Sequence, residues 1–154
     1  MVQDADLEYE PANLLDFIKL FQTHDLDIVY GNRFGKNNKF IYVGNWIGNR
    51  ALSLFSSLFT WFRNGMWTQD MECCYKMVKG EVLRAIAPKF TATSNFGIEP
   101  EITARLSRYK PKLKFAELPI DYYPRTIAEG KHMRGISDGT KALLEILKYN
   151  LFKK

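Results

Sequence analysis

Short apolar runs with the character of strands alternate along this chain with longer segments whose apolar residues recur at helical spacing. The expected strands cover 27–30, 74–78 and 113–118. The expected helices cover 11–21, 44–63, 81–87, 100–109 and a last segment capped by Asp138. Because strands that alternate with helices pack in layers, the pattern predicts an α/β fold. Pro119 cannot donate to a sheet ladder, so the chain around it is expected at a sheet edge or a bulge.

The composition narrows the possible partners without choosing one. The 154 residues suffice for one domain with a real core, and 22 Lys and Arg against 17 Asp and Glu give a net charge of +5. This excess favours nucleotides, phosphorylated lipids, an acidic membrane surface or nucleic acid, although a basic protein with none of these partners has the same composition. We expect no nucleic-acid partner, because no RNA- or DNA-binding motif is present and the aromatic residues lie mostly at core spacing.

The cysteines and the hydropathy of the chain indicate in which cellular compartment the protein is expected. Cys73 and Cys74 are adjacent, and neighbouring cysteines rarely form a disulfide without strain, so both are expected to be reduced, partly buried thiols. No signal peptide is expected at the acidic N-terminus, and no apolar run reaches the length of about 18 residues that marks a transmembrane helix. These features favour a cytoplasmic protein.

Two acidic residues, Asp4 and Asp6, follow a short apolar run and have one small residue between them. If a strand continues through them, both carboxylates point to the same side. Two close carboxylates repel each other unless a cation lies between them, and oxygen ligands suit Mg²⁺ or Mn²⁺, whose coordination substrate phosphates can complete. The pair is therefore interpreted as half of a metal–diphosphate site, and a solvated turn is the alternative.

Residues 44–63 form an amphipathic segment with two distinct faces. The apolar stripe consists of Ile47, Ala51, Leu54, Phe55, Leu58 and Phe62. The opposite stripe, rich in hydroxyl and amide groups, consists of Asn49, Ser53, Ser56, Ser57, Thr60 and Asn64. We expect the apolar stripe to face the body of the protein. Some of the flanking residues are expected to be exposed and to contact a lipid interface, and these are Trp46, Leu52, Phe59 and Trp61.

Five segments together resemble a known family. They are Asp4-Ala5-Asp6-Leu7-Glu8, Gly31-Asn32-Arg33-Phe34, Asp70-Met71-Glu72-Cys73-Cys74-Tyr75-Lys76, Phe96-Gly97-Ile98-Glu99-Pro100-Glu101-Ile102, and Glu117 to Arg125 followed by Glu129-Gly130-Lys131. Their order and spacing resemble the second half of family-2 glycosyltransferases with the GT-A fold, above all the dolichyl- or polyprenyl-phosphate sugar transferases. The resemblance runs over nearly all of the chain.

The resemblance implies a fold and the division of one domain into three segments. The fold is a partial GT-A domain of Rossmann-like α/β type, with a mixed sheet flanked by helices. A single domain then has three segments. Residues 1–35 carry the metal motif, residues 36–66 form the acceptor loop and amphipathic helix, and residues 67–154 bind the acceptor and phosphates.

The resemblance also implies the metal ligands. Asp4 and Asp6 match the Asp-x-Asp motif that holds a divalent cation, Mg²⁺ or Mn²⁺, on the diphosphate of the sugar donor. Glu8 lies where the family often has Gln or Glu as a further metal contact. Asp6 is in addition one of the implied catalytic residues.

Four other residues match donor and acceptor contacts of the family. Arg33 matches the arginine of a Gly-Ser-Arg motif, and Arg125 and Lys131 match a basic pair that contacts phosphates. Asp70 matches an acid beside the acceptor, so Asp70 and Arg125 join the implied catalytic set. Other interpretations remain for the cations. Arg33 could pair with nearby acids at 25 and 27, and the late loop could simply be solvated.

The chemistry of such a reaction is compatible with these residues. Breaking the bond to a nucleotide diphosphate requires that the charge of the leaving group be neutralised, which a divalent ion with Arg and Lys supplies. A phosphate acceptor is already ionised at neutral pH and needs no strong general base. The two histidines, His24 and His132, are accordingly interpreted as surface residues.

The implied function is transfer of a sugar, with inversion, from a nucleotide sugar to a polyprenyl phosphate or a related glycan acceptor. The protein would act peripherally at the cytoplasmic face of the membrane, in the synthesis of cell-envelope polysaccharide. The acids at 4, 6 and 8 are expected to converge, and Arg125 and Lys131 are expected to face the same cleft.

One departure from the family leaves an alternative open. In the family, strand–helix units for the base and ribose, roughly 60–90 residues, precede the metal motif, whereas only three residues precede it here. We therefore expect the nucleotide-binding units to be missing and the isolated chain to be a poor catalyst. The alternative is a non-catalytic fragment that acts as a binding or assembly subunit, or the product of a broken reading frame. A missing N-terminal half or a second copy of the chain is then a possible partner.

Overall fold

The centre of the molecule is a small mixed sheet. The computed structural model describes residues 1–4, 7–94, 96–130 and 135–152. Strand β1 (Ile28–Asn32) lies in the middle, antiparallel to β2 (Lys76–Val78) and parallel to β3 (Phe115–Pro119). The α/β class with a mixed sheet is thus confirmed. Strand β3 lies at the edge of this sheet and ends at Pro119, as expected of a residue without a backbone N–H.

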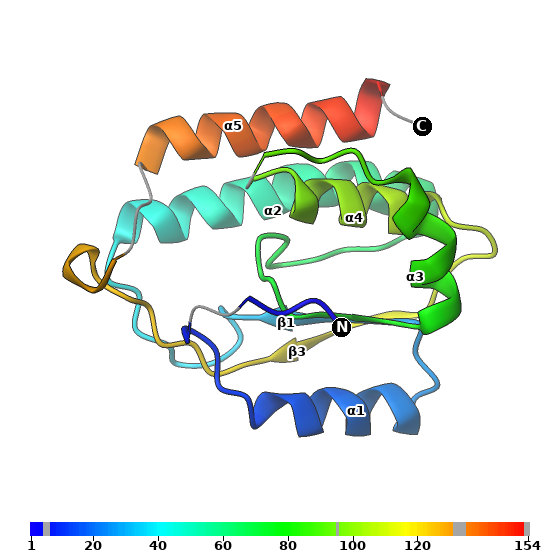
Figure 1. Ribbon diagram of the computed structural model, residues 1–154, viewed down its shortest axis with the longest axis horizontal. Coiled ribbons are helices and arrows are strands. Elements are labelled where there is room, and N and C mark those ends of the chain that lie inside the picture. Colours follow the sequence, from blue (N-terminus) through cyan, green and yellow to red (C-terminus); the bar gives the residue numbers. More distant parts are fainter. Residues whose placement is uncertain (5–6, 95, 131–134, 153–154) are drawn as a thin grey trace.

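Helices cover both faces of the sheet (Figure 1). Helix α1 (Asn13–Thr23) lies on one face, and α2 (Val43–Asn64) with α4 (Ile98–Arg108) lies on the other. Helix α5 (Gly135–Leu147) packs outside α2 and α4 and continues into a π-helical turn over Lys148–Phe152. The shorter elements are α3 (Gly80–Ile86) and 3-10 turns over Ala87–Lys89 and Ile127–Glu129.

The central strand separates two cores. All five residues of β1 are buried, and their side chains alternate between the faces of the sheet. Val29 belongs to the apolar cluster on the α1 side, which includes Phe17. Tyr30 belongs to the cluster that includes Ile102 of α4, and its hydroxyl group lies 3.0 Å from the hydroxyl oxygen of Thr103. The continuous apolar run in the sequence therefore corresponds to a strand covered on both faces.

The expected orientation of α2 is wrong. The buried residues of this helix are the small polar ones, and they are Ser53, Ser56, Ser57, Thr60 and Asn64. Residues 65–71 follow α2 along this face without regular structure, so their backbone groups need hydrogen-bond partners. The hydroxyl of Ser57 donates to the carbonyl of Thr68 at 2.8 Å and accepts from its N–H at 3.0 Å. In the same way, Ser53 accepts from the N–H of Met71 at 2.8 Å.

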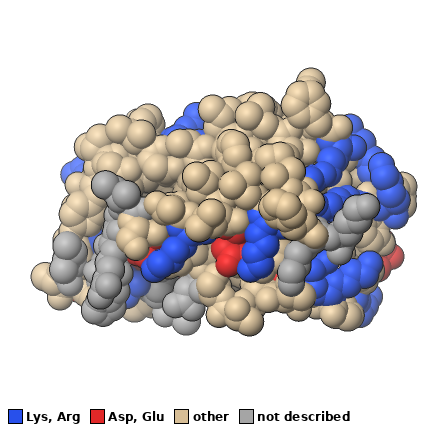
Figure 2. Space-filling model, turned by 90° about the horizontal axis from the view of Figure 1, so that it is seen from above, with Lys and Arg blue, Asp and Glu red and all other residues tan. Residues whose placement is uncertain are grey.

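The apolar stripe of α2 is consequently on the outside. We define the apolar face as Trp46, Ile47, Leu54, Leu58, Trp61 and Phe62 of α2 with Leu143, Leu144, Leu151 and Phe152 at the C-terminal end, all of them exposed. Phe62 and Phe152 retain 78% and 80% of their accessible surface. Figure 2 shows a broad area without charged side chains on this side of the molecule, with basic side chains at one end. Such a contiguous area is unusual for a surface that contacts only water.

The length and hydropathy of the helices also bear on membrane topology. Among the described residues, no helix combines the length and the apolar character that crossing a bilayer requires.

Candidate functional site

A cavity of about 400 Å³ opens where the parallel strands β1 and β3 end. Its charged lining residues are Asp4, Glu8, Arg33, Glu72, Glu99 and Arg125. Arg33 directly follows β1, and Arg125 lies in the segment that follows β3. The other four come from the N-terminal segment, the loop before β2 and the start of α4. The carboxyl ends of parallel strands are where α/β proteins most often hold ligands.

Arg33 is held in the wall of the cavity by Asp70. Its Nε and Nη2 donate to the two carboxylate oxygens of Asp70 at 2.8 and 2.7 Å, and its backbone N–H donates to the same carboxylate at 2.9 Å. Burial alone lowers the pKa of the Arg33 guanidinium, but the carboxylate of Asp70 raises it, so the pKa lies well above its ordinary value. Arg33 is therefore a fixed positive charge.

The alternative partners of Arg33 are excluded by this geometry. Asp25 and Asp27 instead form ion pairs with Lys79, and Asp25 also pairs with Lys114. Asp70 is fully buried and contacts Arg33, and it is not among the residues that line the cavity. Its predicted catalytic role stays a prediction, and the contact that the structure provides is one that orients Arg33.

Glu8 joins the N-terminal segment to the segment after β3. Its two carboxylate oxygens accept hydrogen bonds from the hydroxyl of Tyr122 and the backbone N–H of Arg125, both at 2.9 Å. The Nε of Arg125 lies 3.5 Å from Glu8 Oε1.

The predicted metal and phosphate residues are thus partly brought together. Asp4, Glu8, Arg33 and Arg125 line the same cavity, although they come from distant parts of the sequence. Asp6 and Lys131 lie outside the described residues. Within the described part of the chain, no group of three or more acidic, His or Cys side chains forms a ready-made metal site.

Two further acids in this cavity had no assigned role in the sequence. Burial raises the pKa of Glu72 to about 7, with Glu99 adding to the shift. Burial also raises the pKa of Glu99, against the attraction of Lys76. Both lie inside segments that carry the family resemblance. The available signal was an acid within a run of otherwise buried residues, a position where acids are rare unless they are paired or functional.

Among the described residues, more carboxyl than guanidinium groups line the cavity. The four carboxyl groups are those at 4, 8, 72 and 99, and the two guanidinium groups are those at 33 and 125. Each guanidinium already lies close to a carboxylate, Arg33 to Asp70 and Arg125 to Glu8. The donor set therefore fits a hydrated divalent cation, because Mg²⁺ is typically held by one or two carboxylates, with waters and phosphate oxygens as the other ligands.

A second cavity of about 260 Å³ lies between the first turns of α2 and α5. It shares four lining residues with the first cavity, namely Asn45, Asn49, Glu72 and Phe96. Its remaining lining residues are mostly small or apolar, and they are Gly44, Gly48, Leu52, Asp138, Gly139 and Ala142. The two cavities therefore meet at one common wall.

The fold and the cavity together define an α/β protein with a charged cavity at the ends of its parallel strands. The sequence is similar to the undecaprenyl-phosphate mannosyltransferase of Micrococcus luteus, with 28% identity over 134 residues. That alignment covers 86% of this chain and 52% of the relative, so the chain spans about half the length of the curated relative it matches. No family model matches the chain. No solved structure matches it significantly.

Proposed function

We propose that this chain carries the metal- and phosphate-binding side of a glycosyltransferase that uses a nucleotide sugar as donor. The observation that carries the proposal is the convergence of Asp4, Glu8, Arg33 and Arg125 on one cavity. The family resemblance assigns these residues to the metal and the diphosphate. The name of the Micrococcus luteus relative supports sugar transfer in general, and it supports a polyprenyl phosphate as the acceptor.

In the proposed reaction an oxygen of the acceptor phosphate attacks the anomeric carbon with inversion, and the bond from that carbon to the donor diphosphate breaks. The diphosphate leaves with additional negative charge. Arg33, oriented by Asp70, and Arg125, oriented by Glu8, stabilise that charge through fixed positive groups. Asp4 and Glu8 would hold Mg²⁺ or Mn²⁺, which when bound neutralises diphosphate charge.

Pyrophosphate binding tests this site directly. We expect pyrophosphate to bind in the presence of Mg²⁺ and to bind at least about tenfold more weakly in EDTA, because the carboxyl groups that line the cavity repel the free anion. Asp4→Asn should weaken binding roughly fivefold, since it removes one charged ligand. Isothermal titration calorimetry measures both effects.

The matched control is Asp16→Asn, an exposed acid on α1 outside the cavity. This substitution should leave the affinity for pyrophosphate unchanged. Binding that is equally strong in EDTA, or equally reduced by the two substitutions, would contradict the assignment.

The acceptor would be reached from a membrane surface. The apolar face of α2 and the C-terminal segment exposes ten large apolar side chains. Burying such side chains in the interfacial region of a bilayer is favourable by roughly 25 cal/mol for each Å² of apolar surface. The proposal therefore includes peripheral association with the cytoplasmic face of a membrane that contains the lipid acceptor.

Co-sedimentation with anionic phospholipid vesicles at low salt tests the membrane contact. The double substitution Trp61→Ser with Phe62→Ser should lower vesicle binding by about tenfold or more, because both side chains are exposed on the apolar face. The matched control, Leu15→Ser with Ile18→Ser, alters two exposed residues of α1 on the opposite side of the sheet and should have little effect. Absence of vesicle binding by the folded wild-type protein would refute the membrane contact.

A further inference from the structure

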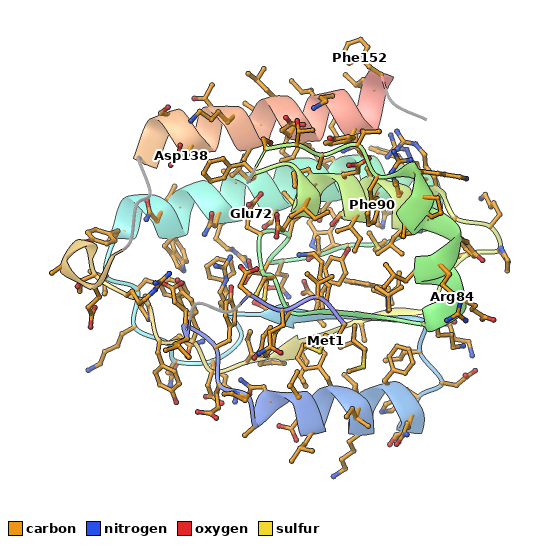
Figure 3. The ribbon with its side chains drawn as sticks, in the orientation of Figure 1. Met1, Glu72, Arg84, Phe90, Asp138 and Phe152 are labelled. Atoms are coloured by element: carbon orange, nitrogen blue, oxygen red, sulfur yellow. The ribbon has the colours of Figure 1, made fainter. Side chains whose placement is uncertain are left out.

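The wall shared by the two cavities contains a buried polar atom, in Glu72, without a hydrogen-bond partner among the described residues. This atom is Oε1 of the carboxyl group. Figure 3 shows the Glu72 side chain in the region between the sheet and the layer formed by α2 and α4. A buried carboxyl oxygen that forms no hydrogen bond is costly, which suggests that a ligand supplies the missing donor.

Two amide side chains lie on the same wall. Asn45 and Asn49 are four residues apart on α2, so they occupy the same face of the helix, and both line both cavities. Gly44 and Gly48 lie beside them. Apart from α2 itself, no heavy atom of the described residues would lie within 4 Å of a Cβ atom built at either glycine, so this part of the helix borders open space there.

Phe96 completes the shared wall with an aromatic ring. It lines both cavities, and Lys141 Nζ lies 5.8 Å from the centre of the ring. A flat aromatic surface next to hydrogen-bonding groups can contact the C–H face of a sugar ring while its hydroxyl groups are bound at the edge.

This set of groups suits hydroxyl groups better than phosphates or a hydrocarbon chain. Amides both donate and accept hydrogen bonds, and a carboxyl group accepts them, which matches the donor and acceptor character of each sugar hydroxyl. Near neutral pH burial keeps part of Glu72 protonated, with a pKa of about 7, so it can also donate. A phosphate at this wall would lie beside the carboxyl groups of Glu72 and Glu99, whereas the guanidinium groups that favour it lie at Arg33 and Arg125.

We propose that Asn45, Asn49, Glu72 and Phe96 form the binding site for the hexose ring of a sugar ligand. The inference rests on the proposed function, in which this hexose is the sugar of the donor. Its anomeric phosphate would then extend into the larger cavity, toward the cation and the arginines. A glycan acceptor offers the same hydroxyl chemistry, and a probe without the phosphate distinguishes the two sources.

Ligand-observed NMR of the full chain with Mg²⁺ tests the site. The probes are mannose 1-phosphate, glucose 1-phosphate, methyl α-mannoside and inorganic phosphate. We expect at least one sugar phosphate to bind about tenfold more tightly than inorganic phosphate, and Glu72→Ala and Asn49→Ala each to weaken it roughly fivefold. Affinity for inorganic phosphate should not change. The matched control is Glu81→Gln, an exposed acid in the first turn of α3.

The outcomes separate the two proposals. If inorganic phosphate and the sugar phosphates bind equally, the hexose site is refuted while the phosphate site stands. If none of the phosphates binds with Mg²⁺, the proposed function itself fails and the hexose site fails with it. If methyl α-mannoside binds as tightly as mannose 1-phosphate, and the same substitutions weaken both, the wall binds a hexose but the assignment to the donor is overturned. Asn49→Ala places a better helix former in α2, so loss of folding is not expected to obscure the result.

Discussion

Replacing Asp70 by alanine is expected to lower the free energy of unfolding by about 3–5 kcal/mol. The substitution leaves the Arg33 guanidinium buried and without its two hydrogen bonds to the carboxylate, and it also removes the acceptor of the Arg33 N–H. Because small domains are stable by only about 5–15 kcal/mol, this loss is a large fraction of the total. Urea denaturation followed by circular dichroism measures it.

A double-mutant cycle distinguishes two causes of the destabilisation by Asp70→Ala. One is the unpaired charge of the buried Arg33, and the other is the loss of the hydrogen bonds between Arg33 and Asp70. Adding Arg33→Met to Asp70→Ala removes the unpaired cation and should restore part of the stability. The matched control is Asp25→Ala, which breaks ion pairs with Lys79 and Lys114 at the surface and should change stability little. An Asp70→Ala protein as stable as the wild type would show that the Arg33 pair contributes nothing to the fold.

The opposite result is expected for Glu72→Gln, which should stabilise the protein above neutral pH. Burial raises the pKa of Glu72 from 4.5 to about 7, so between these values the folded protein retains a proton that the unfolded chain has released. Its stability therefore falls as pH rises through this window and stays constant above it. Glutamine has no such penalty, and the gain above pH 7 should be about 3–4 kcal/mol, because each pKa unit corresponds to about 1.4 kcal/mol.

The pH dependence of this gain is the decisive measurement. The difference between Glu72→Gln and wild type in thermal or urea denaturation should vanish below about pH 4, where the carboxyl group is largely protonated in both states. Glu101→Gln is the contrasting variant. Burial alone would raise the pKa of Glu101, but hydrogen bonds from the N–H groups of Thr91 and Ala92 and from Arg105 lower it. Glu101→Gln should therefore destabilise the protein, and a gain for Glu72→Gln that does not depend on pH would contradict its cause.

A stabilising Glu72→Gln substitution has a functional meaning. Residues that destabilise the free protein are common at binding sites. The proposed hexose contact would give the Glu72 carboxyl group such a role.

Much of the fold was readable from local sequence patterns. The apolar run at 27–30 predicted the buried central strand, and the expected helices occur with shifted ends, since α5 begins at Gly135 and not at Asp138. Strand order and the parallel pairing of β1 with β3 come from contacts between distant segments. Local patterns carry no information on such pairing, because the hydrophobic pattern of a strand does not depend on which strand it pairs with.

For the cavity, the motifs predicted several of the residues that line it, but they did not predict the ion-pair and hydrogen-bond partners of those residues. Motif matching selected Asp4, Glu8, Arg33 and Arg125, which line one cavity. It did not show that Arg33 pairs with Asp70 and not with its neighbours in sequence. It also assigned no role to Glu72, whose significance lies in a buried oxygen without a partner. Burial and the absence of a partner are properties of the packed molecule.

Helix α2 separates most clearly what the sequence determined from what the tertiary structure decided. The sequence alone determined that residues 44–63 form an amphipathic helix with an apolar stripe and a hydroxyl-rich stripe. The hydroxyl-rich stripe lies against the neighbouring segment 65–71. N–H groups of this segment donate to the hydroxyl oxygens of Ser53 and Ser57, and its carbonyl oxygens accept from the hydroxyl groups of Ser57 and Thr60. Each of these backbone groups would cost roughly 1–3 kcal/mol if it were buried without a partner. The apolar stripe thereby became the outer surface of the protein.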